Sequence, residues 1–277
     1  MISTVTIFLL IAEILIVVTT PLVLFAIIRF RKLCNFAPFM AGVAALLVIY
    51  PIEALVRGFV FAEDAFLSRI TGNVLINIIL TGVVTIVFGE FVRFIVFRFV
   101  IRESNRRHDA LAFGAGFALV EVTINTFFAA FEPVMVAGLI NESGADAFIA
   151  TFEDPETGRG VVEVMQSITT SRIIVVTINL LLLIVIQISL AMICFYAVKK
   201  KAYRFISLAC GLDFILAVPT SLENAGVIVD IAAMIVQVPL VLFTVYVAAR
   251  CFKDYDKKAV YPDIATFFGI GGRRLGQ

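Results

Sequence analysis

The chain has 277 residues, of which 61% are hydrophobic and only 16% charged, and its mean hydropathy is +1.07. A soluble domain carries roughly 25% charged residues and lacks repeated apolar runs of about 20 residues, so this composition excludes a soluble globular protein. The formal net charge of +1 gives no sign of a nucleic-acid partner. Alternating segments of about 10 residues, typical of a transmembrane barrel, are missing. The sequence therefore predicts an all-α, polytopic membrane helix bundle.

Seven apolar segments, each long enough to cross a bilayer, follow one another along the chain. We predict membrane helices over residues 5–28, 37–60, 73–99, 109–139, 172–198, 204–222 and 225–249. Within the sixth and shortest, Pro219 is expected to end or kink the helix. These segments define one bundle over residues 1–255, followed by a cytoplasmic tail over residues 256–277.

The charges of the connecting loops predict the orientation. Basic residues follow the first, third, fifth and seventh segments, whereas the loop after the second segment and the loop at about 140–171 are acidic. Because basic loops stay on the cytoplasmic side, the N-terminus is predicted outside and the C-terminus inside. The first segment has no positively charged start, so it is expected to be a retained helix and not a cleaved signal.

The loop at 140–171 is the only sizeable piece predicted outside the membrane. Its FEDPETGRG stretch is expected to form an exposed turn of a solvated connector, with a substrate lid as the alternative. The only histidine, His108, falls in a basic cytoplasmic turn. Neither disulfides nor a thiolate metal site is expected, because no CxxC spacing joins the four cysteines, Cys34, Cys194, Cys210 and Cys251.

Four predicted helices place polar side chains at similar depths. At about 1.5 Å per residue, Glu90, Asp213, Gln187 and Glu121 lie about 12, 13, 16 and 18 Å from the cytoplasmic ends of their helices. Glu90 and Arg93 are three residues apart, so they share a helix face and can pair. Ionisable groups at this depth cost at least about 2.5–3.5 kcal/mol each, so such a layer is by default a functional site.

Two explanations of the layer remain open. One protonated carboxyl group beside an ionised one is the arrangement that general acid–base catalysis uses. Alternatively, the polar groups only fasten the helices together. Asn125, one turn beyond Glu121, is placed to orient that carboxylate. Gly114 and Gly116 allow close approach of a helix or of a substrate backbone.

Other polar residues lie outside this layer. Glu53 and Arg57 are one turn apart, nearer the outer face, and are expected to form a structural pair. Glu13, in the first segment, has no partner that the sequence can assign.

At these residues the chain resembles the YhfC family, intramembrane peptidases of the glutamic type that are distantly related to the prenyl-protein-processing (CAAX) and bacteriocin-processing membrane proteases. PFMAGVAALLVIYPIEALVRG is similar to the family's Gly-then-Glu helix. GEFVRFIVFRFVIRESNRRHDALAFGAG is similar to its Glu-Glu-x-x-Arg helix and Gly-rich helix start, and IQISLAMICFYAVKKKAYRFISLACGLDF to its fifth and sixth helices. The resemblance covers most of the chain and implies a membrane peptidase fold, which we expect in a prokaryotic cell membrane.

The chain departs from the family pattern at its chemical groups. Gly89 stands where the first of two acids is expected, and the positions expected to hold histidines carry Phe117, Gln187 and Ala209. A family mechanism in which Glu and His activate water, with or without a metal, therefore lacks its bases. We predict no metal and no other cofactor, because the remaining carboxylates would suit only a hard cation and not zinc.

Three hypotheses follow for the function. In a carboxylate-only peptidase, Glu90 is the acid or base, Arg93 orients it and Glu121 is the second carboxylate. The substrate would then lie against Gly116, Phe117, Asn125, Gln187 and Asp213. The missing histidines favour an impaired or inactive relative that binds a membrane peptide, a lipid or a partner protein. A small transporter of protons or cations is the third hypothesis, although no broken-helix repeat supports it.

Access to the layer discriminates among these hypotheses. A water-accessible cavity that reaches the charged residues from the cytoplasm favours an enzyme or a transporter. If Phe117 and its neighbours fill that space, a non-catalytic role is favoured.

Overall fold

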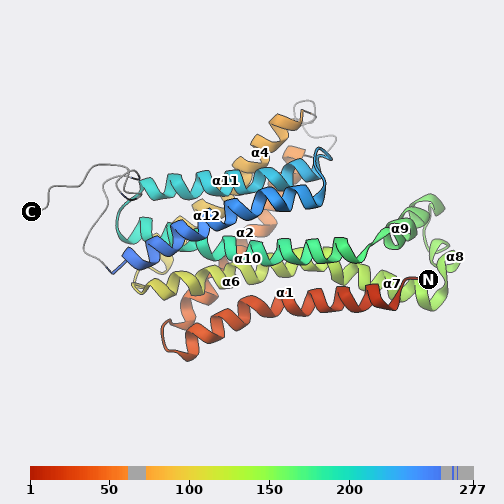
Figure 1. The fold of residues 1–277 in the computed structure, drawn as a ribbon, viewed down its shortest axis with the longest axis horizontal. Helices are drawn as coiled ribbons and strands as arrows, with labels where there is room; N and C mark the ends of the chain where they lie inside the picture. The colour runs from red at the N-terminus through yellow and green to blue at the C-terminus, as the bar shows by residue number, and fades with distance from the viewer. Residues whose placement is uncertain (62–72, 257–263, 265–266, 268–277) are drawn as a thin grey trace, which may run out of the picture.

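The computed structural model describes residues 1–61 and 73–256, together with Ile264 and Phe267 (Figure 1). Seven stretches of this part of the chain are long and apolar enough to span a membrane. They are α1 (Thr4–Phe30), α2 (Phe36–Phe61), a third span (Val74–Val100), a fourth span (Arg107–Ser143), α10 (Thr170–Lys199), α11 (Arg204–Asn224) and α12 (Asp230–Asp254). The predicted all-α bundle is confirmed. The predicted tail, 256–277, lies almost wholly outside the described residues.

The third and fourth spans change their winding along their length. The third consists of α4 (Val74–Ile86), a π-helical turn (Val87–Phe91), α5 (Val92–Ile95) and a second π-helical turn (Val96–Val100). The fourth consists of α6 (Arg107–Thr126), a π-helical turn (Phe127–Phe131) and α7 (Glu132–Ser143). Glu90 lies in the first of these turns, and π-helical turns are frequent at functional sites.

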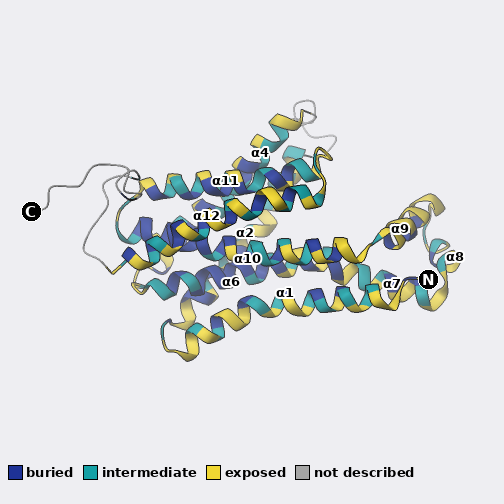
Figure 2. Ribbon diagram, viewed as in Figure 1, coloured by how far each residue is buried: buried dark blue, intermediate teal, exposed yellow. Residues whose placement is uncertain are grey.

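The helices α6 and α10 form the centre of the bundle. α6 packs against α2, α1 and α10, and α10 packs in turn against α12, α11 and α1, while α4 lies along α11. In Figure 1, α10 runs between the pair α6 and α1 and the pair α11 and α12. Burial is densest on α6 and α10, whereas α1 leaves much of its surface uncovered, as a lipid-facing helix does (Figure 2).

Two glycines let α2 approach α6 with backbone against backbone. A methyl group added at Gly116 would collide with the carbonyl oxygen of Phe39, and one added at Gly42 with that of Phe113. Gly114 faces α10 in the same way, because an added methyl carbon would lie 2.6 Å from the Cα of Ile188. Close helix packing therefore accounts for the small residues of α6, including Gly116, whose position is covered by α2.

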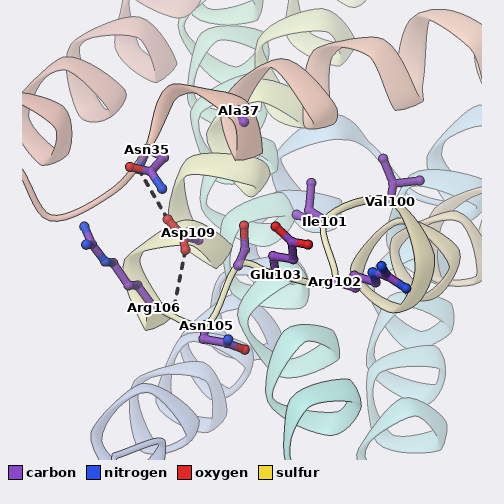
Figure 3. A pocket seen from close by; sticks show the side chains of 10 residues that line it. Asn35, Ala37, Val100, Ile101, Arg102, Glu103, Asn105, Arg106 and Asp109 are labelled. Atoms are coloured by element: carbon purple, nitrogen blue, oxygen red, sulfur yellow. Dashed lines mark hydrogen bonds between the residues drawn. The ribbon is translucent and has the colours of Figure 1, made fainter.

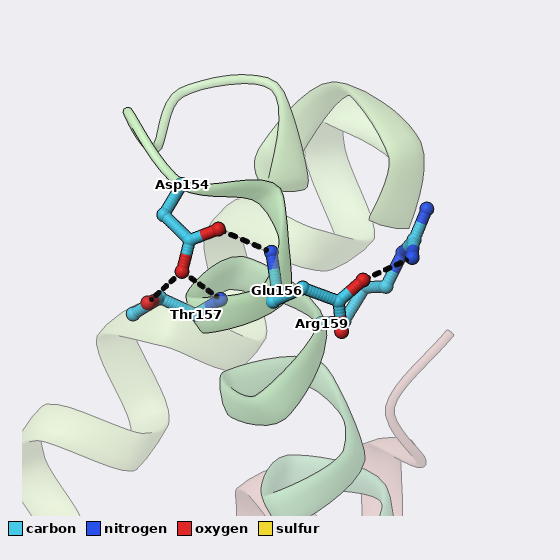
Figure 4. A network of polar contacts seen from close by, with 4 residues as sticks. All are labelled: Asp154, Glu156, Thr157 and Arg159. Atoms are coloured by element: carbon cyan, nitrogen blue, oxygen red, sulfur yellow. Dashed lines mark hydrogen bonds and ion pairs between the residues drawn. The ribbon is translucent and has the colours of Figure 1, made fainter.

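The connection between the fourth span and α10 is largely helical, so the predicted turn is wrong from Pro155 onward, although most of the FEDPETGRG stretch is exposed as predicted. It contains α8 (Ala145–Ile149) and α9 (Pro155–Ser167), and the FEDPETGRG stretch holds the start of α9. Asp154 caps α9 by accepting hydrogen bonds from the backbone amides of Glu156 and Thr157 (Figure 4). A further hydrogen bond from the Thr157 hydroxyl is the main reason why the pKa of Asp154 is lowered.

The sixth helix begins at Arg204 as predicted but ends two residues later, and the seventh helix begins and ends five residues later than predicted. α11 does not end at Pro219 but continues to Asn224, with the proline inside the helix. The chain then turns at Gly226, whose φ of +69° favours glycine, and α12 starts only at Asp230.

Candidate functional site

Arg93 lies at the centre of a buried polar cluster. Its Nη1 donates to the Glu90 carboxylate one turn earlier, and its Nη2 donates to the side-chain oxygen of Gln187 on α10. Its guanidinium lies over the ring of Phe117 on α6, 4.8 Å from the ring centroid. Arg93 is 1% exposed and Glu90 is fully buried. The predicted Glu90–Arg93 pair is confirmed.

The third and sixth spans meet at Gly89. A methyl carbon on Gly89 would lie 3.1 Å from Oδ2 of Asp213, on α11, and 3.3 Å from Nη1 of Arg93. The missing side chain of Gly89 therefore leaves the room in which a carboxylate and the guanidinium come together. Asp213 is itself buried, at 6% exposure.

Glu121 joins the cluster from α6. Its carboxylate interacts electrostatically with Arg93 and Asp213, and the side chain of Gln187 reaches it as well. The third, fourth, fifth and sixth spans thus bring together Glu90, Arg93, Glu121, Gln187 and Asp213.

The cluster contains more acid than base. Besides the three carboxylates around Arg93, Glu53 of α2 interacts electrostatically with both Glu121 and Asp213. Three buried carboxylate oxygens accept no hydrogen bond from the described residues, namely Glu90 Oε2, Glu121 Oε2 and Asp213 Oδ2. Buried acceptors without donors are unfavourable. The cluster therefore has spare capacity for a ligand that supplies hydrogen-bond donors.

The structure changes the predicted role of Asn125 and confirms the predicted Glu53–Arg57 pair. Asn125 is uncovered, and its amide donates to the backbone carbonyl of Glu121 at 3.0 Å, so it does not orient the carboxylate. The Glu53–Arg57 pair is present at 2.7 Å, and Arg57 also donates to the Thr85 hydroxyl at 3.2 Å. Glu53 was predicted nearer the outer face than the polar layer, and the structure adds its electrostatic interactions with Glu121 and Asp213.

Aromatic side chains pack on the side of Arg93 toward the loop between the third and fourth spans, which is predicted to be cytoplasmic. Phe97, one turn further along the third span, lies 4.6 Å from Phe113 and 5.2 Å from Phe195 between ring centroids. These three rings are fully buried, and Phe117 is 2% exposed. These four rings fill the space between the cluster and the loop that joins the third and fourth spans.

Three cavities on the described part of the molecule have volumes of about 660, 270 and 450 Å³, and none of the three is lined by the polar cluster. The first lies at the loops that are predicted to be cytoplasmic, where Arg102, Glu103 and Asn105 line it (Figure 3). There Asp109 accepts hydrogen bonds from the backbone amides of Asn35, at 3.4 Å, and Arg106, at 3.3 Å. Asp109 therefore joins the loop at Asn35 to the loop at Arg106.

The cluster does not fit a transition-metal ion. The described residues contain no group of three or more His, Cys, Asp or Glu side chains arranged to hold a metal. The space between the carboxylates is taken by the guanidinium of Arg93, which stays positively charged and would repel a second cation. His108 lies at the start of α6, with its ring 5.1 Å from that of Phe252.

These observations define the class of the protein as an integral membrane protein with seven helical spans and a charged cluster buried between them. The sequence profile of the YhfC intramembrane metalloprotease family matches residues 14–247, and the chain belongs to that family. The predicted family resemblance is confirmed.

One curated relative is described as an uncharacterized membrane protein YhfC of Bacillus subtilis (strain 168). It is 24% identical over 155 residues, which cover 56% of this chain and 60% of the relative. The bacterial source of this relative agrees with the predicted prokaryotic membrane. No solved structure matches the chain.

Proposed function

We propose that this chain is a YhfC-family membrane protein that binds a membrane-embedded peptide at the Arg93 cluster, with its peptidase chemistry impaired. The observation that carries the proposal is the position of Arg93. Its guanidinium donates hydrogen bonds to Glu90 and Gln187. It therefore occupies the space that a metal ion with carboxylate and imidazole ligands would need. The sequence departures at Phe117 and Gln187 agree, since neither residue supplies a base.

The free carboxylate oxygens support peptide binding. A peptide segment whose helix is opened supplies backbone amide donors, and such a backbone is tolerated at membrane depth only where protein surrounds it. Glu121 Oε2 and Asp213 Oδ2 are acceptors without donors from the described residues. In this proposal Glu121 and Asp213 contact the peptide, while Glu90 and Gln187 hold Arg93 in place.

The test uses the purified protein in lipid bilayers. Its metal content is measured, and cleavage and photocrosslinking of single-span membrane peptides are followed with added zinc and with a chelator. Glu121→Gln removes a proposed contact, and Glu90→Gln removes the partner of Arg93. Glu142→Gln, at an uncovered carboxylate of α7, is the matched control.

We expect no stoichiometric metal, no chelator-sensitive cleavage, and peptide crosslinking that Glu121→Gln weakens and Glu142→Gln does not. Cleavage that is lost with the chelator would refute impaired catalysis and restore a metalloprotease. Cleavage that is indifferent to metal but abolished by Glu90→Gln and Glu121→Gln would instead establish a carboxylate-only peptidase. No crosslinking to the wild-type protein would refute peptide binding.

A further inference from the structure

A second buried carboxylate, Glu13 on α1, lies outside the Arg93 cluster. Glu13 is 2% exposed, and neither of its carboxylate oxygens accepts a hydrogen bond from the described residues. None of the ion pairs in this part of the chain includes it. An ionised carboxylate shielded from water without a counter-charge is strongly unfavourable, and no described residue forms an ion pair that supplies Glu13 with this charge.

The packing of α1 places two threonines at the level of Glu13. One apolar layer, on the side of the N-terminus of α1, contains Leu10 with Ala130 and Ile173. The next layer contains Val17 with Val122 and Leu180. Counting one helical turn inward from the first layer gives Glu13 on α1, Thr126 on α6 and Thr177 on α10.

Two threonine hydroxyls belong to this level and have unused hydrogen-bonding capacity. Thr126 is 1% exposed, and its Oγ1 has no hydrogen-bond partner among the described residues. The Thr177 hydroxyl donates to the carbonyl of Ile173 at 2.8 Å and also lies within hydrogen-bonding reach of the Glu13 carboxylate. The winding of the fourth span changes from α to π directly after Thr126, as is frequent at functional sites.

We propose that Glu13, Thr126 and Thr177 form a binding site for one sodium ion. The donors are two carboxylate oxygens and two hydroxyl oxygens, which are hard ligands suited to a hard cation and not to zinc or copper. One negative charge is balanced by one monovalent ion, whereas a divalent ion would leave an uncompensated charge among apolar layers. The site is independent of the Arg93 cluster and of the proposed peptide binding.

The experiment is thermal unfolding of the full-length protein in lipid nanodiscs at pH 8, followed with a thiol-reactive fluorophore. Sodium chloride is compared with choline chloride at equal ionic strength. Because a ligand stabilises only the state that binds it, we expect sodium to raise the midpoint by about 3 °C or more. Glu13→Gln and Thr126→Val should abolish this rise.

Thr123→Val is the matched control, since that hydroxyl is uncovered and donates to the Leu119 carbonyl of its own helix at 2.6 Å. It should keep the sodium effect. If Glu13→Gln does not fold, Thr126→Val and equilibrium dialysis with radioactive sodium, expected at about one ion per chain, still test the site. Equal midpoints in sodium and choline, or stabilisation by acid alone, would overturn the proposal and leave Glu13 as a protonated contact between helices.

Discussion

Replacing Arg93 should destabilise the bundle more than replacing Glu90, although the two residues form one ion pair. Arg93 is 1% exposed and interacts with Glu90, Asp213 and Glu121. Arg93→Met leaves these carboxylates without their central cation, and removal of one partner from a buried pair costs about 3–5 kcal/mol. Glu90→Gln leaves Arg93 with two carboxylates and Gln187, so the expected cost is about 1.5–3 kcal/mol, that of a hydrogen bond to a charged group.

The two single variants and the double variant should not be additive. Arg93→Met combined with Glu90→Gln removes one of the carboxylate charges that the first change leaves unpaired, so the double variant should be more stable than Arg93→Met alone. The cost of Arg93→Met should also shrink as the pH falls, because protonation neutralises the unpaired carboxylates.

The native cysteines provide the assay. Cys34, Cys194 and Cys251 are buried, so a thiol-reactive fluorophore labels them as the protein unfolds, while the absence of Trp rules out the usual intrinsic fluorescence. We expect Arg93→Met to lower the midpoint by roughly 10 °C. A midpoint for Arg93→Met at or above that of Glu90→Gln would refute the central role of Arg93. A double variant no more stable than Arg93→Met would refute the charge argument.

Three further predictions concern packing, the outer helix and orientation. Gly116→Ala should cost about 1–3 kcal/mol because the methyl group meets the backbone of α2, whereas Gly138→Ala has open space around it; equal thermal midpoints would contradict this. Asp154→Ala should increase hydrogen exchange in the first turn of α9 at pH 7. Because hydrogen bonds lower its folded-state pKa, the stabilisation by Asp154 is complete above the ordinary Asp pKa and is lost as the pH falls through the lowered value. Unchanged exchange would exclude the cap. A cysteine replacing Arg159 should react with an impermeant maleimide from outside the cell, and one replacing Arg102 only after permeabilisation; the reverse pattern would refute the predicted orientation.

The family description and the residues of this chain disagree about a metal. The matched family is described as an intramembrane metalloprotease. Here the carboxylates surround an arginine, and Gly89 leaves the space in which Asp213 approaches it. The metal and cleavage measurements proposed above decide whether this chain has kept the fold with a different chemistry.

The sequence by itself determined the membrane class and the number of spans. Apolar segments of membrane length and the alternation of basic loops are properties of single segments, so they need no tertiary information. The pairing of Glu90 with Arg93 was also predictable, because a spacing of three is fixed by the helix itself. The start of α9 carried a readable signal that was missed, since an Asp cap followed by Pro is typical of a helix N-terminus.

Only the tertiary structure decided which polar residues meet. Arg93 and Gln187 are 94 positions apart, and their contact depends on how the third span and α10 are rotated about their axes. The π-helical turns alter that rotation and leave no clear periodic signal. Asn125 shares a helix with Glu121 yet bonds its own backbone, because short polar side chains compete for nearby carbonyls. Glu53 interacts electrostatically with Glu121 only because α2 packs on α6, where the two backbones touch at Gly42 and Gly116, a contact that neither helix specifies alone.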